Sequence, residues 1–190
     1  MISRDKLRQI NALALPIIGG MVSQNILNLV DTAMVGHLGT EALAAVGIAG
    51  FVNFMCIALV MGRSAGVQAI SARRLGEGRV TETAIPLNGG LVLGVAFGLP
   101  MSIVLIFWVP DFFVLLVDDP IVCEFGAPYL QARLVAMSAL AINYAFRGYW
   151  NGVNLSKIYM RTLVLMHISN VILNYLLIFG NFGFPELGTL

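Results

Sequence analysis

Asp31 is the residue of this sequence whose type and position best suit chemistry inside a membrane. It lies well inside an apolar stretch, residues 13–36, that is long enough to cross a bilayer. A charge at that depth costs about 2.5–3.5 kcal/mol on insertion scales, so an intramembrane carboxylate is by default a functional-site hypothesis. Gln24, Asn28 and Asp31 are spaced i, i+4 and i+7, which places them on one helix face. We interpret Asp31 as a proton acceptor on a polar stripe.

The alternative interpretation of this stripe is structural. Polar side chains hold helices together in membranes by hydrogen bonds between neighbouring helices. Amide and hydroxyl side chains can do so without a carboxylate, however, so the presence of Asp31 favours a functional stripe.

A second polar stripe lies near the C-terminus, where His167, Asn170 and Asn174 are spaced i, i+3 and i+7. At 1.5 Å per residue, Asp31 and Asn174 lie about 8 Å and about 9 Å below the outer ends of their predicted helices, and Tyr129 lies about 12 Å below the outer end of its own. Similar depths predict one cavity that opens outward and uses all three. His167 lies deeper, as a packing residue or, alternatively, a proton relay.

Other polar residues inside the apolar segments are weaker candidates for the lining of such a cavity. Arg133 lies about 18 Å from the outer end of its segment, too far to reach water easily, so we expect it to face the bundle interior. There it could form a structural ion pair or handle substrate or protons. The full set of candidates for the lining of the substrate cavity is Gln24, Asn28, Asn53, Arg133, Asn143, Tyr144 and His167.

Composition identifies a membrane protein. The chain has 190 residues, of which 58% are hydrophobic and 11% charged, with a mean hydropathy of +0.87. Soluble domains carry about 25% charged residues. A net charge of +1 gives no reason to expect a nucleic-acid partner. The sequence has no nucleophile elbow, phosphate-binding loop or metal-ligand spacing, so we expect neither an enzyme nor a metal site.

Five apolar segments approach or exceed the ~20 residues that a membrane span needs. The sequence therefore predicts an all-α integral membrane protein, a polytopic bundle of about five transmembrane helices. Asp119 can cap the helix of the fourth segment, and Pro120 suits its first turn. Along the third segment, glycines at four-residue spacing predict a close contact with another helix; they are Gly90, Gly94 and Gly98. The predicted spans are residues 10–35, 43–70, 85–109, 121–149 and 160–180.

Basic residues alternate between the connections in a positive-inside pattern. They precede the first span, separate the second from the third, and separate the fourth from the fifth, whereas residues 36–42, 110–120 and 181–190 contain no Lys or Arg. We therefore expect a multi-pass protein of the inner (plasma) membrane of a bacterium, with a cytoplasmic N-terminus. The odd number of spans and the final PELGTL, which reads as the start of another helix, suggest a chain cut before a sixth span.

With these residues identified, the sequence resembles the multidrug and toxic compound extrusion (MATE) family, and within it the DNA-damage-inducible F-like branch. The matching stretches are LALPIIGGMVSQNILNLVDTAMVGHLGTEALAAVGIAG, ARRLGEGR and SNVILNYLLIFGNFGFPELGT. The resemblance covers essentially all 190 residues, and its most specific part is VDTAMVGHLG.

The resemblance implies a transporter of twelve helices in two six-helix lobes related by a pseudo-two-fold axis. Residues 1–190 would then be most of the N-terminal lobe, and the C-terminal lobe would be missing. Members export cationic or amphipathic compounds in exchange for protons or sodium, with no cofactor beyond the ion gradient. Their proton-binding cluster matches Asp31, Tyr129 and Asn170 here. A second carboxylate of some members falls at Asn174, and a threonine of the sixth span would lie beyond Leu190.

Two classes of function follow from these observations. In the first, the chain is half of a secondary antiporter for small molecules, with Asp31 as proton acceptor and Tyr129, Asn170, Asn174, Asn28 and Gln24 as its hydrogen-bonding surround. A related alternative is a flippase for lipid-linked precursors from the wider superfamily. In the second class the chain does not transport, and is a membrane interaction module or a degenerate fragment. Reconstitution would discriminate, because a half-transporter has no second lobe against which to rock.

Overall fold

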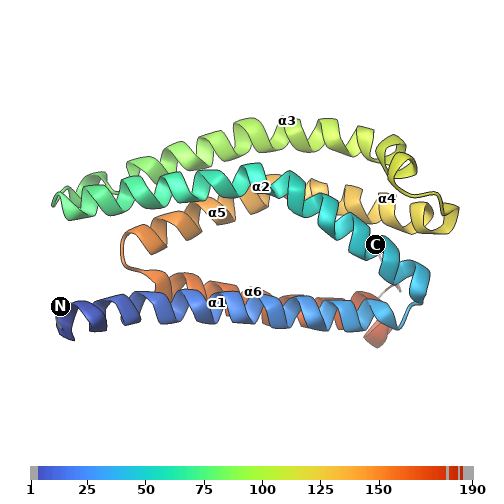
Figure 1. Cartoon of the computed structure of the whole chain (residues 1–190), viewed down its shortest axis with the longest axis horizontal. Coiled ribbons are helices and arrows are strands. Elements are labelled where there is room, and N and C mark those ends of the chain that lie inside the picture. Colours follow the sequence, from blue (N-terminus) through green and yellow to red (C-terminus); the bar gives the residue numbers. More distant parts are fainter. Residues whose placement is uncertain (1–3, 179, 184, 186–190) are drawn as a thin grey trace.

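The structure, a computed structural model, describes residues 4–178, 180–183 and 185, and these residues contain helices and no strands. Figure 1 shows the elements in chain order. Six long helices are joined by short connections, with a single-turn 3₁₀ helix before α3 and another after α6. The long helices are α1 (Arg4–Gly36), α2 (Thr40–Gly76), α3 (Ile85–Leu116), α4 (Pro120–Val135), α5 (Met137–Gly152) and α6 (Ser156–Ile178), and the short ones are η1 (Val80–Glu82) and η2 (Asn181–Gly183).

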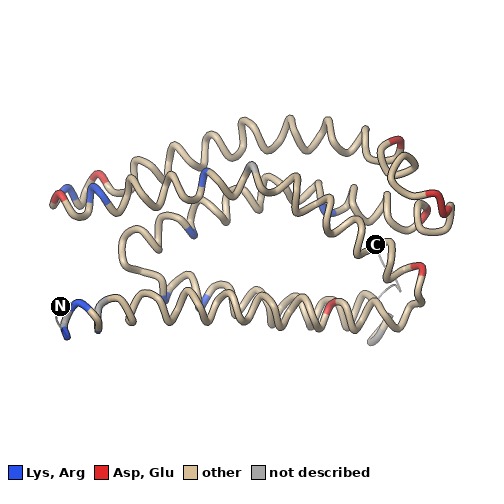
Figure 2. The backbone as a smooth tube through the Cα atoms, in the orientation of Figure 1, with Lys and Arg blue, Asp and Glu red and all other residues tan. Residues whose placement is uncertain are grey.

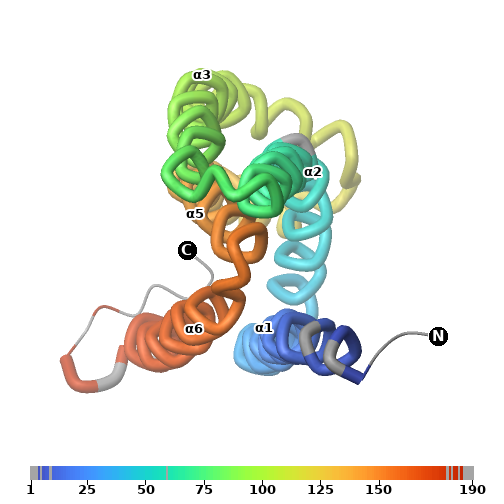
Figure 3. The backbone as a smooth tube through the Cα atoms, turned by 90° about the vertical axis from the view of Figure 1, so that its left-hand side faces the viewer, coloured from blue at the N-terminus to red at the C-terminus, as the bar shows by residue number. Residues whose placement is uncertain are grey.

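The helices form two groups. α1 and α6 lie side by side as a pair, while α2, α3, α4 and α5 pack together as a bundle (Figures 1 and 3). The two groups are joined at opposite ends, since α1 leads into α2 at one end and α5 leads into α6 at the other. Gly39, with φ of 122°, makes the tight turn between α1 and α2.

Small residues bring α3 close to α5, as their four-residue spacing predicts. A Cβ at Gly94 would lie 3.3 Å from the Cβ of Ala141, and one at Gly98 would lie 3.5 Å from Ser138. The other face of α5 approaches α2 even more closely, because a Cβ at Gly148 would collide with the carbonyl oxygen of Ser64. Around these contacts the bundle core is apolar and consists of Ala45, Ala49, Val60, Val109, Phe113, Val122, Leu130, Leu134, Met137 and Ala141.

The prediction of a single helix over residues 121–149 is wrong. The chain breaks at Ala136, and α4 and α5 meet at a bend of 51°. Such a break frees backbone groups, which membranes tolerate only where the protein supplies partners. Here the Ser102 hydroxyl of α3 donates to the Leu134 carbonyl at 2.6 Å, and the Gln131 amide ties α4 to the α3 backbone by a 2.8 Å hydrogen bond to the carbonyl of Ile106.

The end of the third helix also differs from the prediction. We expected a connection over residues 110–120, but α3 continues through Pro110 to Leu116. Burial of Phe113 explains the extension, because its ring is fully buried against Gly126 of α4. The predicted start of α4 is confirmed: Pro120 is its first residue, and the Asp119 carboxylate accepts a 2.9 Å hydrogen bond from the Ile121 amide.

The helices suit a membrane in length, composition and charge. Among the described residues, four helices are long and apolar enough to span one, or five if the bent α4–α5 pair counts as one span. Figure 2 shows Lys and Arg gathered towards the end of the molecule that holds the N-terminus. The connections at the opposite end carry Asp and Glu and no Lys or Arg.

Candidate functional site

The pairing of α1 with α6 brings the two predicted polar stripes face to face. Gly20 allows the approach, since a Cβ there would lie 3.2 Å from the Leu163 side chain. Leu27, one turn from Ser23 and Gln24 on α1, is buried at 7% exposure. We call this contact the α1–α6 seam. Its polar residues are Ser23, Gln24, Asn28 and Asp31 of α1 and His167, Asn170 and Asn174 of α6.

Asp31 and Asn174 meet in the seam. The Asn174 side-chain amide donates to Asp31 Oδ1 at 2.9 Å and to Asn170 Oδ1 at 3.1 Å. All three side chains are half-buried. The similar depths that we inferred from sequence for Asp31 and Asn174 are thus realised as a direct contact, and the carboxylate receives a neutral amide donor.

A second polar contact crosses the seam two turns further toward the N-terminal end of α1. His167 of α6 is buried, and its Nδ1 lies 2.5 Å from the Ser23 hydroxyl. Its Nε2 lies 3.1 Å from Gln24 Oε1. The Gln24 amide donates in turn to Asn28 Oδ1 at 3.4 Å. Gln24, Asn28 and Asp31 therefore form the stripe that their spacing predicts.

Tyr129 and Arg133 lie on α4, outside the seam. The Arg133 guanidinium carbon lies 5.2 Å from the centre of the Tyr129 ring, a cation–π contact. Both residues interact electrostatically with Asp31. Within the described residues no hydrogen bond joins Tyr129 to Asp31, so the structure places this part of the predicted cluster near the carboxylate without direct contact.

Among the described residues, the remaining candidates make none of the polar contacts of the seam. Asn53 is buried in α2 at 8% exposure, and its Oδ1 accepts no hydrogen bond from the residues that the structure describes. Asn143 is exposed on α5. Tyr144 lies against Arg147, whose guanidinium carbon is 5.7 Å from the ring centre. Their assignment to a substrate cavity stays a prediction. Among the described residues, no three His, Cys, Asp or Glu side chains come together in a way that could hold a metal ion.

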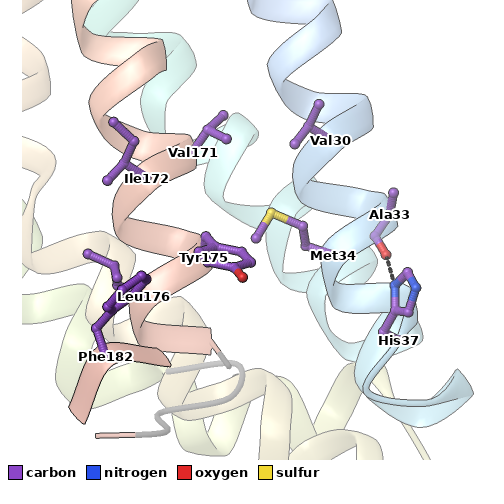
Figure 4. A pocket seen from close by; sticks show the side chains of 9 residues that line it. All are labelled: Val30, Ala33, Met34, His37, Val171, Ile172, Tyr175, Leu176 and Phe182. Atoms are coloured by element: carbon purple, nitrogen blue, oxygen red, sulfur yellow. Dashed lines mark hydrogen bonds between the residues drawn. The ribbon is translucent and has the colours of Figure 1, made fainter. Parts of the chain in front are cut away.

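An apolar pocket of about 650 Å³ lies between α1 and α6, beside the polar contacts (Figure 4). It includes neither Asp31 nor Asn174, although each has a sequence neighbour in the lining. A binding site built on the carboxylate would therefore not be this pocket. The lining residues are Val30, Ala33, Met34, His37, Val171, Ile172, Tyr175, Leu176 and Phe182.

Sequence reasoning missed two sets of residues that shape this region. Ser23 gives no periodic signal of its own, and only its position directly before Gln24 could have singled it out. In the sequence, Arg147 counts only among the basic residues that mark the boundary between the fourth and fifth predicted spans. In the structure it lies between two aromatic rings, 5.7 Å from the centre of Tyr144 and 5.5 Å from that of Tyr159, and so links α5 to α6.

Comparison with known proteins identifies the family. The profile described as MatE matches residues 16–176, which include every residue of the seam. The chain belongs to the MatE family. Its members are membrane transporters and not enzymes. The chain is thus a multi-pass membrane protein with the helical fold of that family.

Individual MatE relatives show the same likeness over part of their length. A protein of Agrobacterium fabrum named "Probable multidrug resistance protein NorM" is 28% identical over 176 residues, which is 93% of this chain and 38% of that protein. A solved multidrug resistance MATE transporter in an outward-facing conformation superposes with a TM-score of 0.87 at 26% identity, over 95% of this chain and 40% of that one.

A second similar solved structure is that of a protein from Pyrococcus furiosus. Its structure superposes with a TM-score of 0.82 at 27% identity, again over 95% of this chain and 40% of the other. That protein is described as a transporter of the MOP superfamily whose binding pocket has reversed polarity, which suggests a different function. The chain thus spans about two fifths of the length of the relatives it matches.

Proposed function

We propose that residues 1–190 form most of the N-terminal lobe of a secondary antiporter that exports cationic or amphipathic compounds in exchange for protons. The observation that carries the proposal is the Asp31 carboxylate, half-buried in the α1–α6 seam and bound by an amide instead of a cation. A carboxylate held in this way can bind either a proton or a cation.

Coupling follows from what protonation does to the seam. The bond from the Asn174 amide to ionised Asp31 is charge-assisted and weakens when the carboxylate becomes neutral. Protonation therefore loosens the contact of α1 with α6, and it also removes the negative charge that would attract a cationic substrate. Proton and substrate would thus compete for one state of the lobe. Each charge that crosses the membrane supplies about 2.3 kcal/mol per 100 mV.

The proposed orientation places the N-terminus in the cytoplasm of a bacterium and the lobe in its inner membrane. Support comes from the alternation of basic connections along the sequence and from their clustering at one end of the structure (Figure 2). Asp31 then lies in the outer half of the membrane.

Arg133 favours a second candidate, an anionic substrate such as a lipid-linked precursor. Its guanidinium is exposed on α4 and, among the described residues, has no carboxylate in ion-pair contact. A substrate site built around this positive charge would attract an anion, and the function would then be that of a flippase.

The experiment uses a two-lobe transporter that begins with this sequence, reconstituted in proteoliposomes. An imposed pH gradient should drive cationic ethidium across the membrane in the direction opposite to the proton flow. A sodium gradient of the same size should not drive ethidium movement. Ethidium movement driven only by the sodium gradient would make sodium, and not the proton, the coupling ion. No movement of ethidium, together with translocation of a fluorescent lipid-linked anion, would favour the flippase and overturn the proposed substrate class.

A further inference from the structure

His167 is a buried titratable side chain that the proposed coupling at Asp31 does not use. It lies on α6 with 7% of its surface exposed. Both of its ring nitrogens contact side chains of α1: Nδ1 lies 2.5 Å from Ser23 Oγ, and Nε2 lies 3.1 Å from Gln24 Oε1. A histidine needed only to fill space would not require two polar partners from a neighbouring helix.

Gln24 determines which nitrogen carries the permanent proton. An amide oxygen can only accept a hydrogen bond, so His167 Nε2 is protonated and donates to Gln24 Oε1. The other end of the same amide donates to Asn28 Oδ1, which agrees with this orientation of Gln24. Nδ1 is therefore the nitrogen that can gain or lose a proton.

Ser23 can serve both protonation states of the ring. Its hydroxyl donates to Nδ1 when the imidazole is neutral, and accepts from Nδ1–H when the imidazole is charged, after a rotation about one bond. A buried donor without a partner costs free energy, and this switch removes that cost when His167 takes up a proton.

The charged groups around His167 couple it to the proposed site. On α1, Asp31 interacts electrostatically with His167, and the closer polar residues of that helix, Ser23 and Gln24, are neutral. On α4, Arg133 acts on Asp31, and on α5, Arg147 lies against tyrosine rings. The η2 segment brings no titratable side chain. Asp31 is thus the charge that responds directly to the protonation of His167.

We propose that His167 is a second proton-binding site of this lobe, with Ser23 as the positioning residue that allows Nδ1 to be protonated. Ionised Asp31 and protonated His167 attract each other, so neutralising Asp31, by a proton or a bound cation, promotes proton release from His167. This consequence for transport rests on the proposed function, whereas proton binding itself rests on the contacts of the ring.

The test uses the 190-residue chain in lipid nanodiscs, with its histidine rings labelled with ¹⁵N and observed by NMR between about pH 5 and 9. We expect Nε2 of His167 to stay protonated throughout and Nδ1 to gain a proton in one step as the pH falls. The exposed ring of His37 serves as an internal reference. An Nδ1 resonance that does not change over this range, or a neutral ring protonated on Nδ1 instead of Nε2, would overturn the proposal.

Substitutions then separate the positioning role of Ser23 from simple packing. Ser23→Ala removes the acceptor of the imidazolium and should move the titration midpoint of His167 down by about 0.5–1 pH unit, whereas Ser23→Thr should restore it. Ser169→Ala, which changes an exposed serine on α6, the helix of His167, is the control and should leave the midpoint unchanged. An unchanged midpoint in folded Ser23→Ala, or failure of Ser23→Thr to restore it, would overturn the role of Ser23.

Asp31→Asn tests the coupling of the two sites in the same spectra. It should move the His167 midpoint in the same direction as Ser23→Ala, and no shift would overturn the coupling. These readings need no transport. The spectra test proton binding by His167, and the efflux assay tests coupling by Asp31. Failure of either proposal can therefore be told from failure of the other.

Discussion

At the scale of single residues, the chemistry of the lobe depends on what faces Asp31. Its direct partner is the amide of Asn174 at 2.9 Å, and the charge of Arg133 acts on it from α4. No other carboxylate among the described residues takes part in this contact. Its carboxyl signal should therefore show one main titration step, on which the charge of His167 acts, and not the two steps of a coupled carboxylate pair.

Asn174→Asp should change that single step into two. Two carboxylates within hydrogen-bond distance cannot ionise independently, so the pair should show two coupled steps in a ¹³C-carboxyl NMR titration of the chain in nanodiscs. Asn143→Asp, which adds a carboxylate on an exposed position of α5, should leave the titration of Asp31 unchanged. Uncoupled titration of residues 31 and 174 in the first variant would contradict the contact between them.

Which residues of the seam could be predicted from sequence depends on the signal that each one gives. The i, i+4 and i+7 spacing of α1 and the estimated depths predicted that Asp31 approaches Asn174, and the structure joins them. Ser23 could not be predicted, because its role depends on the rotation of α6 that brings His167 opposite it. Tyr129 lay at a similar estimated depth, but depth says nothing about direction, and within the described part of the chain no hydrogen bond joins Tyr129 to the carboxylate.

At the scale of helices, small residues determine how closely the bundle packs. The ridge on α3 was visible in the sequence as glycine at every fourth position, whereas the break at Ala136 was not. The residues on either side of Ala136 are apolar and give no sign of a helix end, and Pro128 lies eight residues before the break. At the break, the Ser102 side chain of α3 donates a hydrogen bond to the Leu134 carbonyl. A single sequence does not reveal such tertiary contacts.

Gly148→Ala should destabilise the bundle by about 1–3 kcal/mol, the usual cost of overpacking. The new methyl group would meet the backbone carbonyl of Ser64, which cannot move aside as a flexible side chain would. Gly66→Ala is the matched control, because a Cβ there meets nothing within 4 Å apart from the adjoining backbone of its own helix. The measurement is the midpoint of thermal unfolding in detergent. Equal midpoints for the two variants would contradict the close approach of α5 to α2.

The α2–α3 connection carries a network of ion pairs that responds to acid. Hydrogen bonds from Arg73 and Arg79 lower the pKa of Glu77 below its usual value of 4.5, and Arg79 lowers that of Glu82. Because these folded-state pKa values are depressed, the stabilisation is fully present above about pH 4.5 and is lost as the pH falls through the lowered values.

A spin label at Thr81→Cys, in a background without Cys56 and Cys123, should therefore stay immobile from neutral pH to about pH 4.5 and gain mobility only below it. Arg79→Gln should move the onset to higher pH, because both glutamates lose a partner. A label at Leu155→Cys, in the α5–α6 turn, has no carboxylate beside it in the sequence and serves as the control. The same acid onset at both labels would contradict the role of the ion pairs.

At the scale of the whole molecule, charge defines two ends. The proposed topology places the α2–α3 and α5–α6 connections in the cytoplasm and the α1–α2 and α3–α4 connections outside. In intact cells, Gly78→Cys and Lys157→Cys should be shielded from a membrane-impermeant thiol reagent, and Thr40→Cys and Asp118→Cys should be labelled. Labelling of Gly78→Cys from outside would contradict the orientation.

The most direct test of the central claim, that Asp31 couples efflux to the proton, is Asp31→Asn in a two-lobe transporter that begins with this sequence. The substitution is nearly isosteric, and its amide oxygen can still accept from Asn174, so the protein should fold and insert normally. Ethidium efflux driven by a pH gradient is the measurement. We predict that the variant loses gradient-driven efflux. Efflux at the wild-type rate under the same gradient would contradict the claim and leave the polar stripe of α1 as a helix-packing contact.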